Sequence, residues 1–134
     1  MTIKRAGVWV LVVLLAAEFI AAGARKFAPG SSWSHMFLAW GYPPWFRFVV
    51  GAVEVLSGLA LFVPQARRGA IGVLLAIMAG AVATHLLHGE PRRLILNAIL
   101  CLLLGLLFLL QRRVGAPSST THDPTRKPDA SVMA

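Results

Sequence analysis

The chain has 134 residues, and 57% of them are hydrophobic. A mean hydropathy of +0.73 is too apolar for an ordinary soluble domain of this length. The formal net charge of +8 does not indicate nucleic-acid binding, because the basic residues stand as pairs at the ends of apolar runs, which is typical of membrane spans. The single cysteine, Cys101, excludes an intrachain disulfide and a CxxC redox pair.

Four apolar runs each approach the ~20 residues that a helix needs to cross ~30 Å of hydrocarbon. The runs cover residues 6–24, 46–63, 69–87 and 94–110. The short connections around Pro64 and Pro91 make consecutive runs antiparallel neighbours. We therefore predict an all-α fold, an integral membrane four-helix up-down bundle formed by residues 1–113.

The first run has a second interpretation as a secretory signal peptide. Lys4 and Arg5 would form its charged region, residues 8–17 its apolar region, and residues 22–24 its small-residue cleavage site. Glu18 favours a membrane span, because a cleavable segment rarely carries a charge there. The signal-peptide interpretation stays open at this point.

The loop over residues 25–45 contains three of the four tryptophans. Ser31 or Ser32 can cap a short helix within it. One apolar face of that helix would carry Trp33, Phe37 and Trp40. We predict an interfacial aromatic helix on the membrane surface, either as an anchor or as a lid over the outer mouth of the bundle.

The second run places two charges and two glycines on one helical face. That face consists of Arg47, Gly51, Glu54, Gly58 and Leu61. A charge at membrane depth is costly when it faces lipid, so this face should turn toward the bundle interior. The glycines should let another helix approach closely.

The polar residues within the four runs converge at one depth. Glu18 lies about two turns before the first run ends, His85 about one turn before the third ends, and Asn97 about one turn into the fourth. Arg47 lies in the first turn of the second run, with Glu54 two turns deeper. All five therefore fall in the half of the membrane beneath the aromatic loop, which predicts a polar pocket there.

We expect acid-base candidates and ligand-binding candidates in this pocket. The catalytic candidates are Glu18, Glu54 and His85. The ligand-binding candidates are Arg25, Trp40, Arg47 and Asn97. The alternative is that Glu18 pairs with Arg25 or Arg47, and Glu54 with Arg47, so that these residues only fix the bundle's register. The sequence shows no metal-binding, haem or nucleotide motif, and we expect no metal.

The composition changes to Pro, Ser, Thr and charged residues after Arg113, and we predict a disordered tail over residues 114–134. Four spans would put both termini on one side of the membrane. Eight lysines and arginines fall on that side and five on the other, which predicts cytoplasmic termini.

Several of these segments resemble the DoxX/DoxD-like family of small integral membrane proteins. Residues 17–27, AEFIAAGARKF, are similar to the end of that family's first span, and residues 51–61, GAVEVLSGLAL, to its second. The third run, with Ala79-Gly80-Ala81 and His85, also fits. The resemblance covers about residues 6–112.

The resemblance implies a multi-pass protein of the bacterial inner membrane. Members of the family are linked to redox work, as a subunit of a thiosulfate:quinone oxidoreductase and as membrane partners of detoxifying enzymes. We therefore expect a redox-associated subunit whose polar pocket binds a diffusible quinone or a similar lipophilic molecule. Two alternatives stay open: a membrane enzyme doing acid-base chemistry on a lipophilic substrate, and a non-catalytic scaffold for a soluble oxidoreductase.

Overall fold

The computed structural model describes residues 2–114. These residues form helices and connecting turns without strands, which confirms the all-α prediction. The helices are α1 (Ile3–Arg25), α2 (Ser32–Ala39), α3 (Phe46–Ala60), α4 (Arg67–Leu87) and α5 (Pro91–Val114). The predicted tail lies outside the described residues except for Val114, which is the last residue of α5.

Three of the helices are long and apolar enough to cross a membrane: α1, α4 and α5, with 23, 21 and 24 residues. The helix α3 has 15 residues, which corresponds to about 22 Å. It ends at Ala60 because the backbone tightens into three-residue turns ahead of Pro64, where Val63 donates to the carbonyl of Ala60. The second predicted run, residues 46–63, is therefore helical only to residue 60, and a fourth span at α3 stays a prediction.

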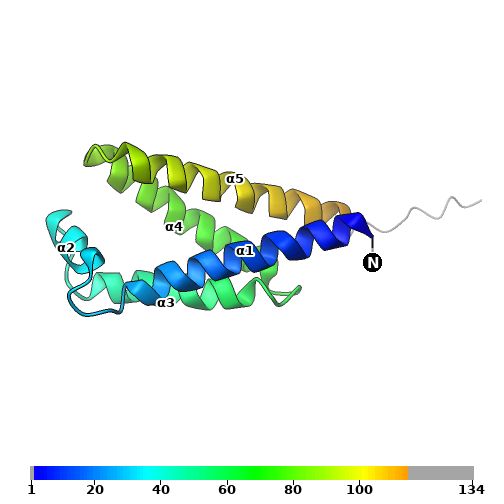
Figure 1. Cartoon of the computed structure of the whole chain (residues 1–134), viewed down its shortest axis with the longest axis horizontal. Coiled ribbons are helices and arrows are strands. Elements are labelled where there is room, and N and C mark those ends of the chain that lie inside the picture. Colours follow the sequence, from blue (N-terminus) through cyan, green and yellow to red (C-terminus); the bar gives the residue numbers. More distant parts are fainter. Residues whose placement is uncertain (1, 115–134) are drawn as a thin grey trace, which may run out of the picture.

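The long helices lie along the long axis of the molecule, and α2 lies at one end (Figure 1). We call this the α2 end. The helix α1 packs against α3 and α5, and α4 packs against α5 and α3. The helices α1 and α5 diverge toward the α2 end (Figure 1). The first and last described residues, Thr2 and Val114, lie at the opposite end, where both line one surface groove.

The backbones of α1 and α3 touch through glycines, as the sequence predicts for α3. A Cβ atom added to Gly23 would lie 2.6 Å from the carbonyl oxygen of Gly51, and one added to Gly51 would lie 2.8 Å from the carbonyl oxygen of Gly23. About two turns further along α3, a Cβ at Gly58 would lie 2.9 Å from the side chain of Ile20. Only glycine fits such a contact, so these residues fix how α1 and α3 cross.

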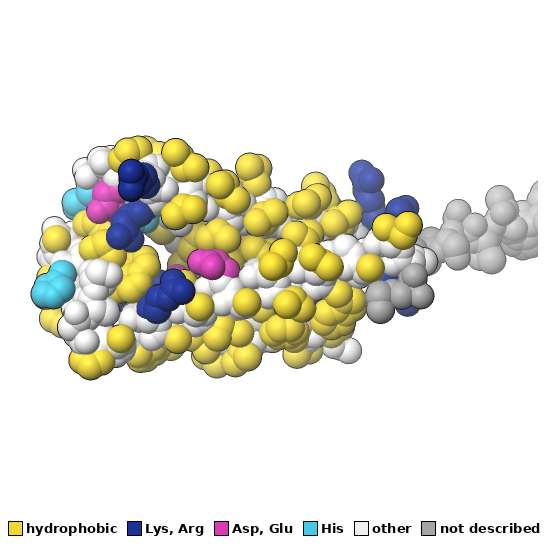
Figure 2. Space-filling model, in the orientation of Figure 1, with side chains coloured by type: hydrophobic (Ala, Val, Ile, Leu, Met, Phe, Trp, Pro, Cys, Tyr) yellow, Lys and Arg dark blue, Asp and Glu magenta, His cyan; other side chains and the backbone are white. Residues whose placement is uncertain are grey.

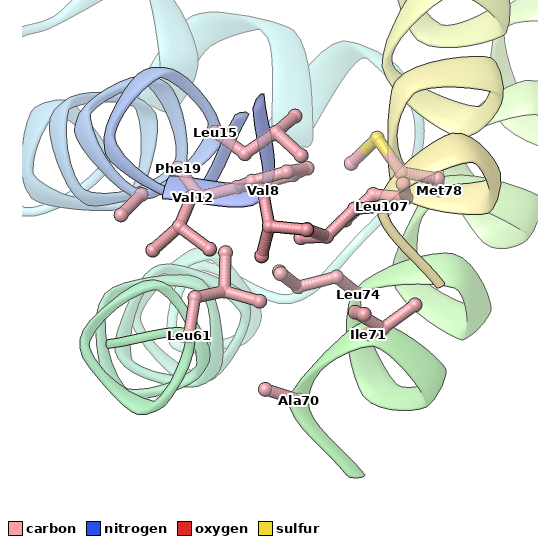
Figure 3. Close-up of a cluster of buried hydrophobic side chains, with 12 residues drawn as sticks. Val8, Val12, Leu15, Phe19, Leu61, Ala70, Ile71, Leu74, Met78 and Leu107 are labelled. Carbon is pink, nitrogen blue, oxygen red and sulfur yellow. The ribbon is translucent and has the colours of Figure 1, made fainter. Parts of the chain in front are cut away.

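The apolar core lies away from the α2 end and joins α1, α4, α5 and the end of α3 (Figure 3). Its largest fully buried side chains are those of Val12, Leu15, Phe19, Leu61, Ile71, Leu74, Leu104 and Leu107. Because lipid tails are as apolar as leucine, this core stabilises the fold by close van der Waals packing. The core thus joins α1 to α4 and α5 at one end, whereas toward the α2 end α1 stays in contact with α3 and diverges from α5 (Figure 1).

The predicted short helix in the aromatic loop is present as α2. Ser31 stands at its N-cap, although its hydroxyl makes no capping hydrogen bond. Gly41 follows the helix with a φ of 82°, a left-handed conformation that glycine adopts without strain. Phe37 is buried, and its ring centroid lies 6.4 Å from that of Trp33 and 5.4 Å from that of Trp40. The three aromatic residues therefore share the predicted face.

Candidate functional site

A cavity of about 660 Å³ lies at the α2 end and is lined by residues of all five helices. Its apolar lining includes Phe19, Val50, Ile77, Met78 and Leu100. Figure 2 shows the molecule hollowed on this face, with hydrophobic side chains inside the hollow and charged side chains at its edges. Trp33, Phe37 and Trp40 form its wall at the α2 end. The volume falls within the roughly 300–1,000 Å³ of typical small-molecule sites.

The structure brings six of the seven sequence-predicted site residues to this cavity. They are Glu18, Arg25, Trp40, Glu54, His85 and Asn97. Arg47 does not line it. Its guanidinium donates to the carbonyls of Lys26 and Ala28 and lies over the ring of Phe48. Carbonyls at a helix C-terminus lack partners within the helix, so Arg47 stabilises the end of α1 instead.

The partner of Glu54 is Lys26 rather than the predicted Arg47. The Lys26 Nζ lies 2.6 Å from the Glu54 Oε2, and the two side chains are only 5% and 4% exposed. Lys26 follows Gly23 by three residues, as Glu54 follows Gly51, so the ion pair lies directly beside the glycine contact. This pair locks α1 to α3 at the cavity wall.

Glu18 makes no ion pair or hydrogen bond to any residue between 2 and 114. The alternative in which Glu18 pairs with Arg25 or Arg47 is therefore not realised in this part of the chain. Glu18 is exposed on α1 and lines the cavity. Its carboxyl group is consequently accessible to a bound molecule.

His85 forms a short contact with Glu90, a residue that the sequence analysis did not include in the site. The His85 Nδ1 lies 2.7 Å from the Glu90 Oε2. The chain reverses at Gly89, whose φ is 65°, and the backbone N–H of Glu90 donates to the carbonyl of His85. The sequence held one signal for this contact: Gly89 follows His85 closely at the end of the helix, and a glycine there indicates that the chain reverses. The ring of His85 also meets the edge of Trp40, with centroids 5.4 Å apart.

The segment around α2 connects the two sides of the cavity. The Tyr42 hydroxyl lies 2.8 Å from the Thr84 Oγ1, which itself donates to the carbonyl of Gly80. Since a threonine hydroxyl has one proton, Tyr42 is the donor in this pair. The ring of Trp33 lies 4.2 Å from the Lys26 Nζ on the α1 side and 5.2 Å from the Arg93 guanidinium on α5. The aromatic segment thus spans the end of the cavity.

Asn97 adds an amide on α5. Within residues 2–114 its buried Nδ2 has no hydrogen-bond partner. A buried polar group without a partner costs about 1–3 kcal/mol, and Asn97 lines the cavity. The amide is therefore suited to hydrogen-bond a molecule bound there. Within the same residues no three His, Cys, Asp or Glu side chains lie close enough to hold a metal ion.

A helical chain with three helices able to cross a bilayer is an integral membrane protein in contact with lipid. A family model described as the DoxX-like family matches residues 10–107, and the chain belongs to that family. The matched region includes every residue that lines the cavity. No curated protein and no solved structure matches the chain.

Proposed function

We propose that this DoxX-like protein binds a lipophilic molecule from the bilayer in the cavity at the α2 end. In this proposal it works as a redox-associated subunit, and a quinone is the leading ligand. The cavity carries the proposal: it combines an apolar lining with a few polar groups, which is the usual composition of a small-molecule site. Trp40 and Tyr42 offer flat aromatic surfaces to a ring system.

The polar groups suit the chemistry of a quinone. A quinone has carbonyl oxygens that accept hydrogen bonds, and Asn97 has a buried amide without a protein partner in residues 2–114. Reduction to a quinol takes up electrons and protons. The protons require an acid-base group at the cavity, which His85 provides. The electrons would come from a soluble oxidoreductase that docks on the membrane protein.

The proposal places the chain in the inner membrane as a four-span up-down bundle with both termini in the cytoplasm. The distribution of charge supports this orientation. Within residues 2–114, six basic side chains lie at the end opposite α2: Lys4, Arg5, Arg67, Arg68, Arg112 and Arg113. Five lie at the α2 end: Arg25, Lys26, Arg47, Arg92 and Arg93.

A second candidate function is acid-base catalysis on a lipophilic substrate. The observation that favours it is that Glu18, which has no partner within residues 2–114, and His85 line the same cavity. An acid and a base at one apolar pocket can move a proton between two positions of a substrate without any electron transfer. Conversion of a bilayer component by the purified protein alone would favour this function over the redox role.

The proposed function is tested by mass spectrometry of small molecules that co-purify with the protein in mild detergent. Ala81→Phe places a ring where Ala81 lines the cavity, whereas Ala79→Phe adds the same ring at an exposed position of α4 outside it. We expect a lipophilic molecule with wild type and Ala79→Phe that is lost in Ala81→Phe. If wild type enriches no molecule over an empty-detergent control, the binding function is wrong and a scaffold role is favoured.

A further inference from the structure

Glu90 and His85 together connect the outside of the molecule with the cavity. The His85 side chain is 6% exposed and lines the cavity, whereas the Glu90 side chain is 29% exposed and does not line it. Their contact of 2.7 Å is within the range of a charge-assisted hydrogen bond. A proton can therefore pass from water at the α4–α5 turn to a buried imidazole through one carboxylate.

The imidazole is held in one orientation. Glu90 engages Nδ1, so Nε2 is the ring nitrogen that remains for a molecule in the cavity. Trp40 lies edge-on against the ring, and the backbone of Glu90 is bonded to the carbonyl of His85. Such support from a carboxyl group and packed neighbours is how proteins fix the direction of a histidine ring.

The other charged groups around the cavity do not offer the same route. Glu54 is held by Lys26. Glu18 lies on α1 and contacts no other polar side chain in residues 2–114. Arg93 approaches Glu90, with its Nε 3.8 Å from the Glu90 Oε2. The remaining groups that face the cavity are Arg25 and the Tyr42 hydroxyl.

We propose that Glu90 and His85 form a proton-transfer pair that links the aqueous side at the α4–α5 turn with the ligand in the cavity. The transfer starts with the His85 ring protonated at Nε2 and with a proton from water on the Glu90 carboxyl group, which donates to Nδ1. The Glu90 proton moves to Nδ1 while the Nε2 proton passes to an oxygen of the ligand, and a return of the ring proton from Nδ1 to Nε2 resets the pair. One proton enters and one leaves, so the ring is neutral afterwards. Glu90 is a positioning and relay residue, and His85 is the group that touches the ligand. The inference rests on the proposed function, since it requires a ligand with a protonatable oxygen.

The test uses a 2-hydroxy-3-alkyl-1,4-naphthoquinone, whose anion and neutral form differ in colour. The full-length protein in lipid nanodiscs is loaded with this probe and subjected to a rapid drop in pH, and empty nanodiscs are subtracted. We expect Glu90→Gln to bind the probe as wild type does but to slow its protonation at least about tenfold, because an amide cannot relay a proton. Glu90→Asp should recover part of the rate. Arg92→Gln, an exposed neighbour that does not line the cavity, should behave as wild type.

The outcomes separate the two proposals. Bound probe that is protonated equally fast in wild type and Glu90→Gln would overturn the relay and leave the binding function intact. If Glu90→Gln loses binding as well, with a melting temperature equal to wild type, Glu90 acts on affinity and the relay is also wrong. Absence of probe binding to wild type would reject quinone binding, and the relay with it.

Discussion

The ion pair between Lys26 and Glu54 should be the most sensitive polar contact in the molecule. Lys26→Met keeps most of the length of the side chain but removes the Nζ, which lies over Trp33 and pairs with Glu54. The Glu54 carboxylate, whose side chain is 4% exposed, is left without this partner. Removing one member of a buried ion pair destabilises a protein by about 3–5 kcal/mol. The free energy of unfolding should fall by this amount.

The double variant Lys26→Met/Glu54→Leu tests the reason for the loss. Replacing a whole buried pair by apolar residues is often close to neutral. The double variant should therefore be more stable than Lys26→Met alone, which means that the two changes are strongly coupled. Arg92→Met removes a positive charge from an exposed position and serves as the control.

Unfolding is measured by titration with sodium dodecyl sulfate in mixed micelles, followed by tryptophan fluorescence. Trp33 lies over Lys26 and reports the region directly. If Lys26→Met loses less than about 1 kcal/mol, or if the double variant is no more stable than the single one, then the buried pair does not hold α1 against α3 in the way described here.

Three further predictions use the same unfolding assay. Gly51→Ala would place a Cβ 2.8 Å from a backbone oxygen of α1 and should cost about 1–3 kcal/mol, whereas Gly72→Ala has no atom within 4 Å and should be neutral or slightly stabilising. Tyr42→Phe removes the hydrogen bond to α4 and should cost about 0.5–1.5 kcal/mol; an unchanged midpoint would mean that this bond is not formed in the membrane. Arg67→Gln removes a buried guanidinium that donates to the Leu61 carbonyl at the end of α3 at 2.7 Å, and the free energy of unfolding should fall by about 1.5–3 kcal/mol. Arg68→Gln, at an exposed position, should have little effect, and equal losses in the two variants would show that this hydrogen bond does not stabilise the fold.

The sequence predicted the helices well where hydrophobicity and length decide the outcome. The runs at residues 6–24, 69–87 and 94–110 correspond to α1, α4 and α5, each extended at its ends by charged residues or turn residues that a hydropathy pattern excludes. The second run was overestimated, since apolar residues continue through the turn before Pro64 while the helix does not.

The arrangement of the polar groups was predicted only in part. Depth along each helix brought Glu18, Glu54, His85 and Asn97 together, because depth follows from residue number. Depth did not predict the partner of Glu54, because Lys26 was assigned to the loop. The contact also depends on how α1 is rotated against α3, which the glycine contact sets. Glu90 was missed for a similar reason: its position depends on a backbone reversal that spacing alone does not specify.

The uneven packing along the helices determines where the molecule can open. Nine apolar residues of the described part that are at most 1% exposed hold the helices at the end away from α2. At the α2 end, the aromatic segment contacts α4 through the hydrogen bond between Tyr42 and Thr84 and through the ring of Trp40. It contacts α5 through the cation–π contact between Trp33 and Arg93. Separation there would break a hydrogen bond of about 0.5–1.5 kcal/mol and a few ring contacts, with the core as the pivot. In the proposed function, a lipid-soluble molecule would enter sideways through a small hinge motion at this end. Native-state hydrogen exchange should be fastest in α2.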